Sequence, residues 1–207
     1  MSGPLAPPSH ATVHLVRHGE VENPRGVVYG RMPGYNLSER GTRQAASAAR
    51  RLEDADIASI WASPLERAQE TAHAIAQPHG LEVVTDERLI ESDTTFEGAT
   101  RSILSFLRSP RQWWSFRNPM RPSWGETFVE IRERMLGAIE DALEQAGGRE
   151  AVIVSHQTPV IVARLALARS RLPPWLPLTL CDTGSVTTLV LDKGRLVTAS
   201  YFKPPDR

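Results

Sequence analysis

Short apolar runs alternate with longer amphipathic segments along most of this chain. Segments 39–52 and 127–145 are predicted helices, and the second repeats its apolar residues at helical spacing. A further helix is predicted over 159–167. Strands that alternate with helices favour βαβ units and a parallel sheet. The runs with the length of strands are 12–16, 57–61, 81–84 and 151–154.

The two ends of the chain complete this pattern. Residues 185–191 and 196–202 are strand-like and meet around Lys193-Gly194, which predicts a terminal hairpin. Residues 1–11 carry prolines and no periodic apolar pattern, so we expect a flexible N-terminus. We therefore predict one α/β domain over 12–207, with a central, mostly parallel sheet flanked by helices in three layers.

Composition narrows the classes of protein. The chain has 24 basic and 24 acidic residues, so no net charge favours nucleic acid or an anionic membrane as a partner. Cys181 is the single cysteine, which excludes an internal disulfide and a cysteine-rich zinc site. No signal-peptide pattern or membrane-spanning apolar run is present. We expect a cytoplasmic protein, either a monomer or a homodimer.

The first predicted strand ends in a polar pair, Arg17-His18, followed by Gly19. Open α/β sheets bind ligands outside the carboxyl ends of their strands. A buried guanidinium needs an anion, and a phosphate accepts two hydrogen bonds from it. Neutral imidazole is a competent nucleophile toward phosphorus. An isolated Arg-His pair is more often a polar strand end without function, so a phosphate site is indicated only if further phosphate-binding groups follow along the chain.

A second strand end also has the features of an anion site. The strand at 57–61 leads into Ser63 and Pro64, which we expect to begin a helix, with Ser63 as its N-cap and Arg67 about one turn in. A helix N-terminus that follows a strand binds anions. Taken alone, Arg67 would be a solvated helix residue.

The segment Leu15–Glu20 resembles the signature of the histidine phosphatase superfamily, also called the phosphoglycerate mutase-like family. Further blocks resemble that family in the same order: Ser63–Ala72, Leu89–Glu91 with Phe96–Gly98, and Ser155-His156. The resemblance implies that His18 is phosphorylated during turnover, that Arg17, Arg67 and His156 hold the phosphoryl group, and that Glu91 donates a proton. It also implies that no metal or cofactor is needed, because arginines and histidines supply the positive charge.

The same resemblance suggests substrate contacts. Asn23, in the Gly- and Pro-rich loop 20–37, is the candidate for a side chain that touches phosphate. Tyr29 and Gly30, with Arg31, lie where family members cover the substrate. Gln157 stands where the family usually has glycine, and its backbone N–H stays available.

Residues 99–125 interleave arginines with tryptophans and phenylalanines. This pattern fits single-stranded nucleic acid, or a cap that packs aromatic side chains over a pocket; the zero net charge favours the cap. Glu97 is interpreted as a structural residue at the mouth of this cap. Gly125-Glu126-Thr127 resembles the family's Gly-Glu-Ser element, which opens the following helix.

The resulting prediction is a phosphomonoesterase that acts on a small phosphorylated metabolite. A phosphoglycerate mutase-type phosphotransferase is the alternative, but family mutases carry paired arginines over the pocket and no such pair lies between Phe96 and Trp124. A second alternative is a non-catalytic protein that binds phospho-ligands or acts as a scaffold. The presence of both histidines, both arginines and a candidate acid argues against it.

Overall fold

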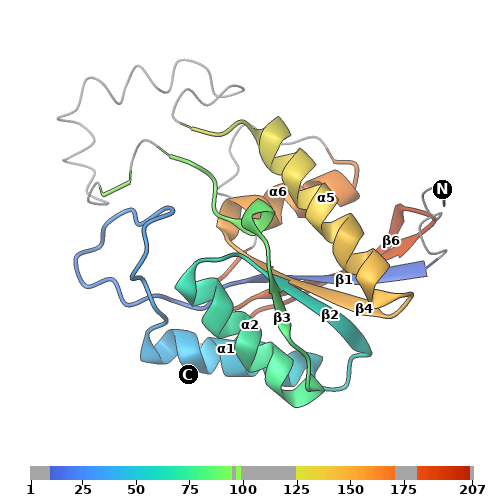
Figure 1. Ribbon diagram of the computed structural model, residues 1–207, viewed down its shortest axis with the longest axis horizontal. Helices are drawn as coiled ribbons and strands as arrows, with labels where there is room; N and C mark the ends of the chain where they lie inside the picture. Colours follow the sequence, from blue (N-terminus) through green and yellow to red (C-terminus); the bar gives the residue numbers. More distant parts are fainter. Residues whose placement is uncertain (1–9, 95–96, 99–124, 171–180, 206–207) are drawn as a thin grey trace.

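The computed structural model describes residues 10–94, 97–98, 125–170 and 181–205 (Figure 1). Within them the chain forms six strands, four α-helices and one short 3₁₀ helix, η1. In chain order these are β1 (His10–Arg17), α1 (Glu39–Leu52), β2 (Ile57–Ala62), α2 (Glu66–His79), β3 (Val83–Thr85), η1 (Glu87–Leu89), α5 (Phe128–Ala146), β4 (Glu150–Ser155), α6 (Gln157–Leu167), β5 (Val186–Asp192) and β6 (Arg195–Phe202).

The strands form one mixed sheet in the order β3-β2-β4-β1-β5-β6. The first four are parallel, while β5 and β6 join antiparallel at the β1 side. Arg17 pairs in register with Ser155, and Ala62 pairs with Val154. The carboxyl ends of β1, β4 and β2 therefore lie side by side at one edge of the sheet, as parallel strands require.

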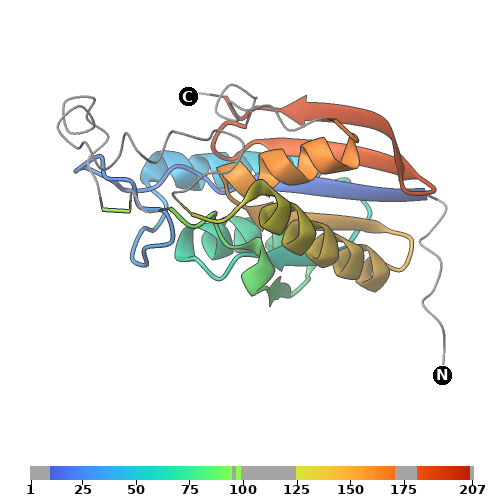
Figure 2. The same cartoon turned by 90° about the horizontal axis from the view of Figure 1, so that it is seen from above.

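Helices cover both faces of the sheet (Figures 1 and 2). On one face α1 and α2 bury a cluster that includes Val16, Ile60 and Ile75. On the other face α5 and α6 bury a cluster that includes Leu15, Met135 and Ile161. Leu15 and Val16 are adjacent in β1 and face opposite clusters, because successive strand side chains alternate between the two faces of a sheet. The predicted three-layer α/β fold is confirmed.

Helix ends follow local side-chain chemistry. The Ser38 hydroxyl accepts a hydrogen bond from Gly41 N at 3.0 Å and begins α1 where the sequence predicts it. Thr127 and Glu130 form a reciprocal capping box at the start of α5. The prediction that Ser63 caps α2 is wrong: the N-cap is Leu65, and the Ser63 hydroxyl contacts a distant histidine instead.

Other element bounds shift slightly. The strand predicted over 81–84 is β3 at Val83–Thr85, and α6 begins at Gln157 rather than at 159. The predicted cap at 99–125 lies almost entirely outside the described residues, as does most of the predicted N-terminal segment, so both stay predictions. Asp93 and Gly125 lie on either side of the 95–124 interval and are in close contact, because a Cβ on Gly125 would overlap the carbonyl oxygen of Asp93. Among the described residues, no helix has the length and apolar character to span a membrane.

Candidate active site

Two histidines meet where neighbouring parallel strands end. His18 follows β1 and His156 follows β4, and the His18 backbone N–H donates to the Ser155 carbonyl oxygen at 3.0 Å. Their ring centroids lie 5.0 Å apart at an interplanar angle of 61°. In-register pairing of β1 with β4 therefore places both imidazoles side by side at the sheet edge that binds ligands in open α/β folds.

His18 is buried, with 1% of its surface exposed, and its ring is fixed by the backbone. Its Nδ1 lies 2.6 Å from the carbonyl oxygen of Gly19. A carbonyl only accepts, so Nδ1 carries the hydrogen and Nε2 keeps its lone pair in the neutral ring. Burial, followed by the charges of Arg17 and Arg67, lowers the pKa of His18 well below its usual value. The imidazole is thus neutral and nucleophilic at neutral pH.

His156 is fully buried and points one ring nitrogen at Ser63. Nε2 lies 2.8 Å from the Ser63 hydroxyl, which also accepts from Leu65 N at 3.4 Å and can give its own proton to the ring. His156 then carries its hydrogen on Nδ1, which has no hydrogen-bond partner among the described residues. Burial, followed by His18 and the nearby arginines, lowers the pKa of His156 well below its usual value.

Arg67 is a fully buried cation in the first turn of α2. Its Nη2 donates to the Gly30 carbonyl oxygen at 2.6 Å, and the guanidinium lies 4.9 Å from the centre of the Tyr29 ring. Nε and Nη1 are buried and, within the described chain, have no hydrogen-bond partner. Burial lowers the pKa of Arg67, because desolvation disfavours its charged form.

Arg17 adds a second guanidinium to the same site. Its Nη1 donates to the Cys181 carbonyl oxygen at 2.6 Å, while its buried Nε lacks a hydrogen-bond partner in the part of the chain described. Together with Arg67 and His156, it presents buried donors that no described protein group satisfies. Such donors are rare in native structures and point to a ligand that supplies acceptors. A tetrahedral oxyanion such as phosphate has the charge and the number of oxygens.

Glu91 lies within the electrostatic reach of both guanidiniums. Its Oε1 accepts from the Ser92 backbone N–H at 2.8 Å and from the Ser92 hydroxyl at 3.2 Å. Burial raises the pKa of Glu91, and the Ser92 hydrogen bonds and the charges of Arg17 and Arg67 oppose that rise only in part. A carboxyl group whose pKa is raised near a phosphate site is suited to general acid catalysis.

The remaining predicted contacts differ in how they are placed. The Tyr29 ring lies 6.4 Å from the His18 ring and stacks on Tyr35, and the Gly30 carbonyl holds Arg67. Gln157 is the first residue of α6, directly after His156. Asn23 uses its side-chain amide to close its own loop, donating to Val27 O at 2.9 Å and accepting from Val27 N at 3.2 Å. Contact of Asn23 with phosphate therefore stays a prediction.

The sequence profile of the histidine phosphatase superfamily (branch 1) matches residues 13–203. The chain belongs to this superfamily. The resemblance carried by the four sequence blocks is thus confirmed. The protein is a hydrolytic enzyme of the histidine phosphatase type.

Individual relatives differ in what their names state. An uncharacterized protein of Mycobacterium tuberculosis is 48% identical over 198 residues, covering 95% of this chain and 98% of that protein. Phosphoserine phosphatase 1 of Hydrogenobacter thermophilus is 30% identical over 190 residues, 88% of each chain. The probable phosphoglycerate mutase GpmB of Cronobacter sakazakii is 36% identical over 152 residues, 70% of this chain and 68% of that protein. Among solved structures, YhfR of Bacillus stearothermophilus aligns with a TM-score of 0.78 at 26% identity, covering 90% and 94%.

Two side chains that support this histidine phosphatase site, Thr71 and Ser155, lie in the family-like sequence blocks but were given no role there. Thr71 accepts from the Gly19 backbone N–H at 3.1 Å and donates to the Arg67 carbonyl at 2.8 Å, so it links the ends of β1 and α2. Ser155 donates to the Leu89 carbonyl at 2.7 Å and anchors the segment that leads to Glu91. Thr71 lies inside the Ser63–Ala72 motif that identified Arg67, so its place in this motif could have indicated a role at the site.

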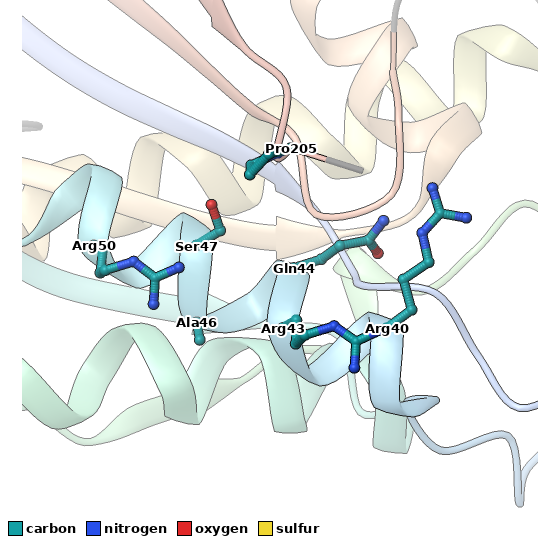
Figure 3. A pocket seen from close by; sticks show the side chains of 7 residues that line it. All are labelled: Arg40, Arg43, Gln44, Ala46, Ser47, Arg50 and Pro205. Atoms are coloured by element: carbon teal, nitrogen blue, oxygen red, sulfur yellow. The ribbon is translucent and has the colours of Figure 1, made fainter. Parts of the chain in front are cut away.

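A separate basic groove of about 300 Å³ lies between α1 and the C-terminal segment (Figure 3). It contains neither histidine nor carboxylic acid, so it lacks the groups for phosphoryl transfer. Arg40 on its rim pairs with Glu20 at 3.1 Å, and Gln44 accepts from the Glu20 backbone N–H at 2.8 Å. The groove is lined by Arg40, Arg43, Gln44, Ala46, Ser47, Arg50 and Pro205.

Proposed function

We propose that this histidine phosphatase hydrolyses a small phosphomonoester through a phosphohistidine on His18. The observation that carries the proposal is the set of buried, unpaired donors on Arg17, Arg67 and His156 beside a neutral His18. Among the described residues Arg17 and Arg67 form no ion pair, although Glu91 lies within electrostatic reach of both. Their charge fits a dianionic phosphate, whose binding offsets the desolvation penalty of the guanidiniums. The partner is therefore a small phosphorylated substrate.

In the first step the lone pair on His18 Nε2 attacks phosphorus while the bond from phosphorus to the ester oxygen breaks. Arg17, Arg67 and His156 donate to the phosphoryl oxygens as the group passes in line from one atom to the other. Glu91 gives its proton to the leaving oxygen, so an alcohol departs and a carboxylate remains. His18 Nδ1 keeps its hydrogen and goes on donating it to the Gly19 carbonyl oxygen, and this hydrogen bond stabilises the positive charge on the phosphorylated ring.

In the second step water attacks the phosphohistidine. The Glu91 carboxylate takes a proton from that water, the phosphorus–nitrogen bond breaks, and its electron pair returns to His18 Nε2. Inorganic phosphate forms, and both residues regain their starting protonation. The reaction is balanced without a metal ion or cofactor.

A mutase would use the same intermediate but return the phosphoryl group to a second hydroxyl. It would need further cationic groups to hold the reoriented intermediate, and the segment between Phe96 and Trp124 contains no Arg-Arg pair. We therefore favour hydrolysis, and the tryptophans of that segment suggest a substrate with a bulky or apolar alcohol portion. A scaffold role would not require the half-buried acid Glu91.

The test is to trap the intermediate with a ³²P-labelled phosphomonoester and quench in acid and in base. We expect label on His18 that is stable in base and labile in acid, with none in the His18→Ala variant. Label on Ser63 or Ser155 would contradict the mechanism. Product analysis separates the alternatives: release of inorganic phosphate supports a phosphatase, and transfer to a second hydroxyl without release supports a mutase.

A further inference from the structure

Glu126 is a carboxylate held between two arginines, just before α5. Its Oε1 accepts from Arg134 Nε at 2.6 Å, and its Oε2 accepts from Arg134 Nη2 at 2.9 Å and from Arg31 Nη2 at 3.0 Å. The side chains of Glu126 and Arg134 are each 14% exposed. The Arg134 pair is bidentate, which gives both energy and a fixed orientation.

Both arginines extend from Glu126 to the segment that carries Glu91. Arg31 Nε donates to the carbonyl oxygen of Glu91 itself at 2.8 Å. Arg134 Nη1 donates to the carbonyl oxygen of Arg88 at 2.5 Å. One carboxylate therefore orients two guanidiniums that grip the backbone on both sides of Leu89 and Ile90. We call Arg31, Glu126 and Arg134 the carboxylate clamp.

The side chains expected to bind phosphate are anchored by hydrogen bonds to groups outside the clamp, although Gly30 directly precedes Arg31 and Arg134 lies within electrostatic reach of His156. His18 is fixed by Gly19, Arg67 by Gly30 and His156 by Ser63. The arginines of the clamp instead donate hydrogen bonds to the carbonyl oxygens of Glu91 and Arg88. Disturbing Glu126 would thus shift the proton donor relative to the leaving oxygen and leave the nucleophile in place.

We propose that Glu126 is a positioning residue that acts through Arg31 and Arg134 to set where Glu91 delivers its proton. This inference rests on the proposed function, in which Glu91 is the acid. General acids contribute about 10²- to 10⁴-fold in rate, and a misplacement of about 1 Å costs on the order of 10²-fold. The loss therefore depends on how strongly the leaving group needs a proton.

The first variant is Glu126→Gln, which keeps the shape and removes the charge. With phenyl phosphate, whose phenolate is a poor leaving group, we expect kcat/KM, which reports formation of the phosphohistidine, to fall about 10- to 100-fold. With p-nitrophenyl phosphate we expect kcat/KM to fall less than about 3-fold. A merely structural role would lower both rates by the same factor.

A second variant covers the case in which the buried Gln fails to fold. Arg31→Lys keeps a cation beside Glu126 but removes the guanidinium fork that also holds the Glu91 carbonyl. Because Arg31 is 34% exposed, this change is milder for folding. It should show the same selective loss with phenyl phosphate.

Glu130→Gln is the matched control. Glu130 stands on the same helix start, and its carboxylate binds Thr127 rather than an arginine of the clamp. It should weaken the cap of α5 and leave the ratio of the two rates unchanged. A selective loss in Glu130→Gln equal to that in the clamp variants would overturn the inference.

The wild-type enzyme separates the two proposals. If it neither hydrolyses these esters nor forms phosphohistidine, the proposed function fails and the inference with it. If the wild type is active and folded Glu126→Gln and Arg31→Lys keep the wild-type rate ratio, only the role of Glu126 is refuted. If Glu126→Gln does not fold, the ratio measured with Arg31→Lys decides.

Discussion

His18 and Glu91 both lie near Arg17 and Arg67, and desolvation shifts their pKa values in directions that both favour the proposed reaction. Burial disfavours charge, so it lowers the pKa of the histidine and raises the pKa of the carboxyl group. At neutral pH the histidine therefore keeps its lone pair, and a larger share of Glu91 keeps its proton. The same physical effect thus prepares both the nucleophile and the acid.

The roles of Glu91 and Glu97 can be distinguished by comparing how each variant hydrolyses esters with poor and good leaving groups. Glu91→Gln should lower kcat/KM, which reports formation of the phosphohistidine, about 10²- to 10⁴-fold with phenyl phosphate and much less with p-nitrophenyl phosphate, because nitrophenolate needs no proton. Glu97→Gln should show no such difference, since its carboxylate binds the Arg31 backbone N–H. If the dependence appears with Glu97→Gln and not with Glu91→Gln, the two roles are exchanged.

The pH dependence of kcat/KM follows from the same carboxyl group. Glu91 must be protonated at the start of the first step, so kcat/KM for phenyl phosphate should fall as pH rises through its raised pKa. Since the pKa is raised, that fall should begin at higher pH than an ordinary Glu would give. In Glu91→Gln the basic limb should vanish. A basic limb that persists in this variant would assign the proton to another group.

Much of the site could be predicted at this scale because each residue stands beside a local signal. Arg17 and His18 end an apolar strand, and Arg67 lies in a motif after the next strand. The tautomer of His18 and the contact of Ser63 with His156 could not be predicted. They depend on where a carbonyl points and on a hydrogen bond between residues 93 apart in sequence.

At the scale of elements, α1 packs unusually close to the loop after β1. Gly19 and Gly41 are in contact, and a Cβ on Gly41 would overlap the carbonyl oxygen of Glu20. Exposed helix positions gain stability from Gly→Ala, but here added volume meets rigid backbone. The sequence shows a glycine at the start of a helix; only the packing of α1 shows why it is there.

Two helical glycines should respond in opposite ways. Gly41→Ala should lower the free energy of unfolding by about 1–3 kcal/mol, because it pushes the helix away from Glu20. Gly137→Ala, in the middle of α5, should raise it by about 0.5–1 kcal/mol, because alanine favours the helix and its Cβ would lie at an ordinary contact distance, 3.4 Å, from a guanidinium nitrogen of Arg88. Denaturant unfolding of both variants measures the contrast, and a gain in both would show that α1 can shift freely.

The order and type of the elements could be predicted more fully than their contacts. The predicted α1 coincides with the observed helix because Ser38 supplies a local cap. The cap of α2 was wrongly assigned, because the Ser63 side chain is used by the end of another strand. Sheet order is likewise a property of long-range pairing, since β4 inserts between β1 and β2 although it follows both in sequence.

At the scale of the whole molecule, a protein with zero formal net charge places Arg17 and Arg67, neither of which forms an ion pair with a described residue, near His18 at one edge of its sheet. We expect these charges to favour binding of a phosphate and to lower the stability of the ligand-free protein. A buried charge without a partner destabilises a protein, and a partner that binds only the folded state restores stability. Removing the charge of Arg67 should therefore abolish activity without lowering the free energy of unfolding of the ligand-free protein.

Arg67→Met tests this expectation. Met has a comparable volume and no charge, so without phosphate the free energy of unfolding should stay equal or rise by about 1 kcal/mol. The change also removes the Gly30 hydrogen bond and the Tyr29 contact, which limits the gain. Catalysis should be lost, because one of the two phosphate arginines is gone.

Inorganic phosphate supplies the decisive measurement, because we expect it to bind the folded wild type and not the unfolded chain. At about 100 times its dissociation constant it should stabilise the wild type by about 2.7 kcal/mol, which corresponds to a rise in Tm of roughly 5–11 °C for a chain of this size. Arg67→Met should show little of that rise at the same concentration, whereas Arg149→Met, an exposed arginine paired with Asp56, should keep it. If Arg67→Met is strongly destabilised and still gains stability from phosphate, Arg67 serves the fold rather than the anion.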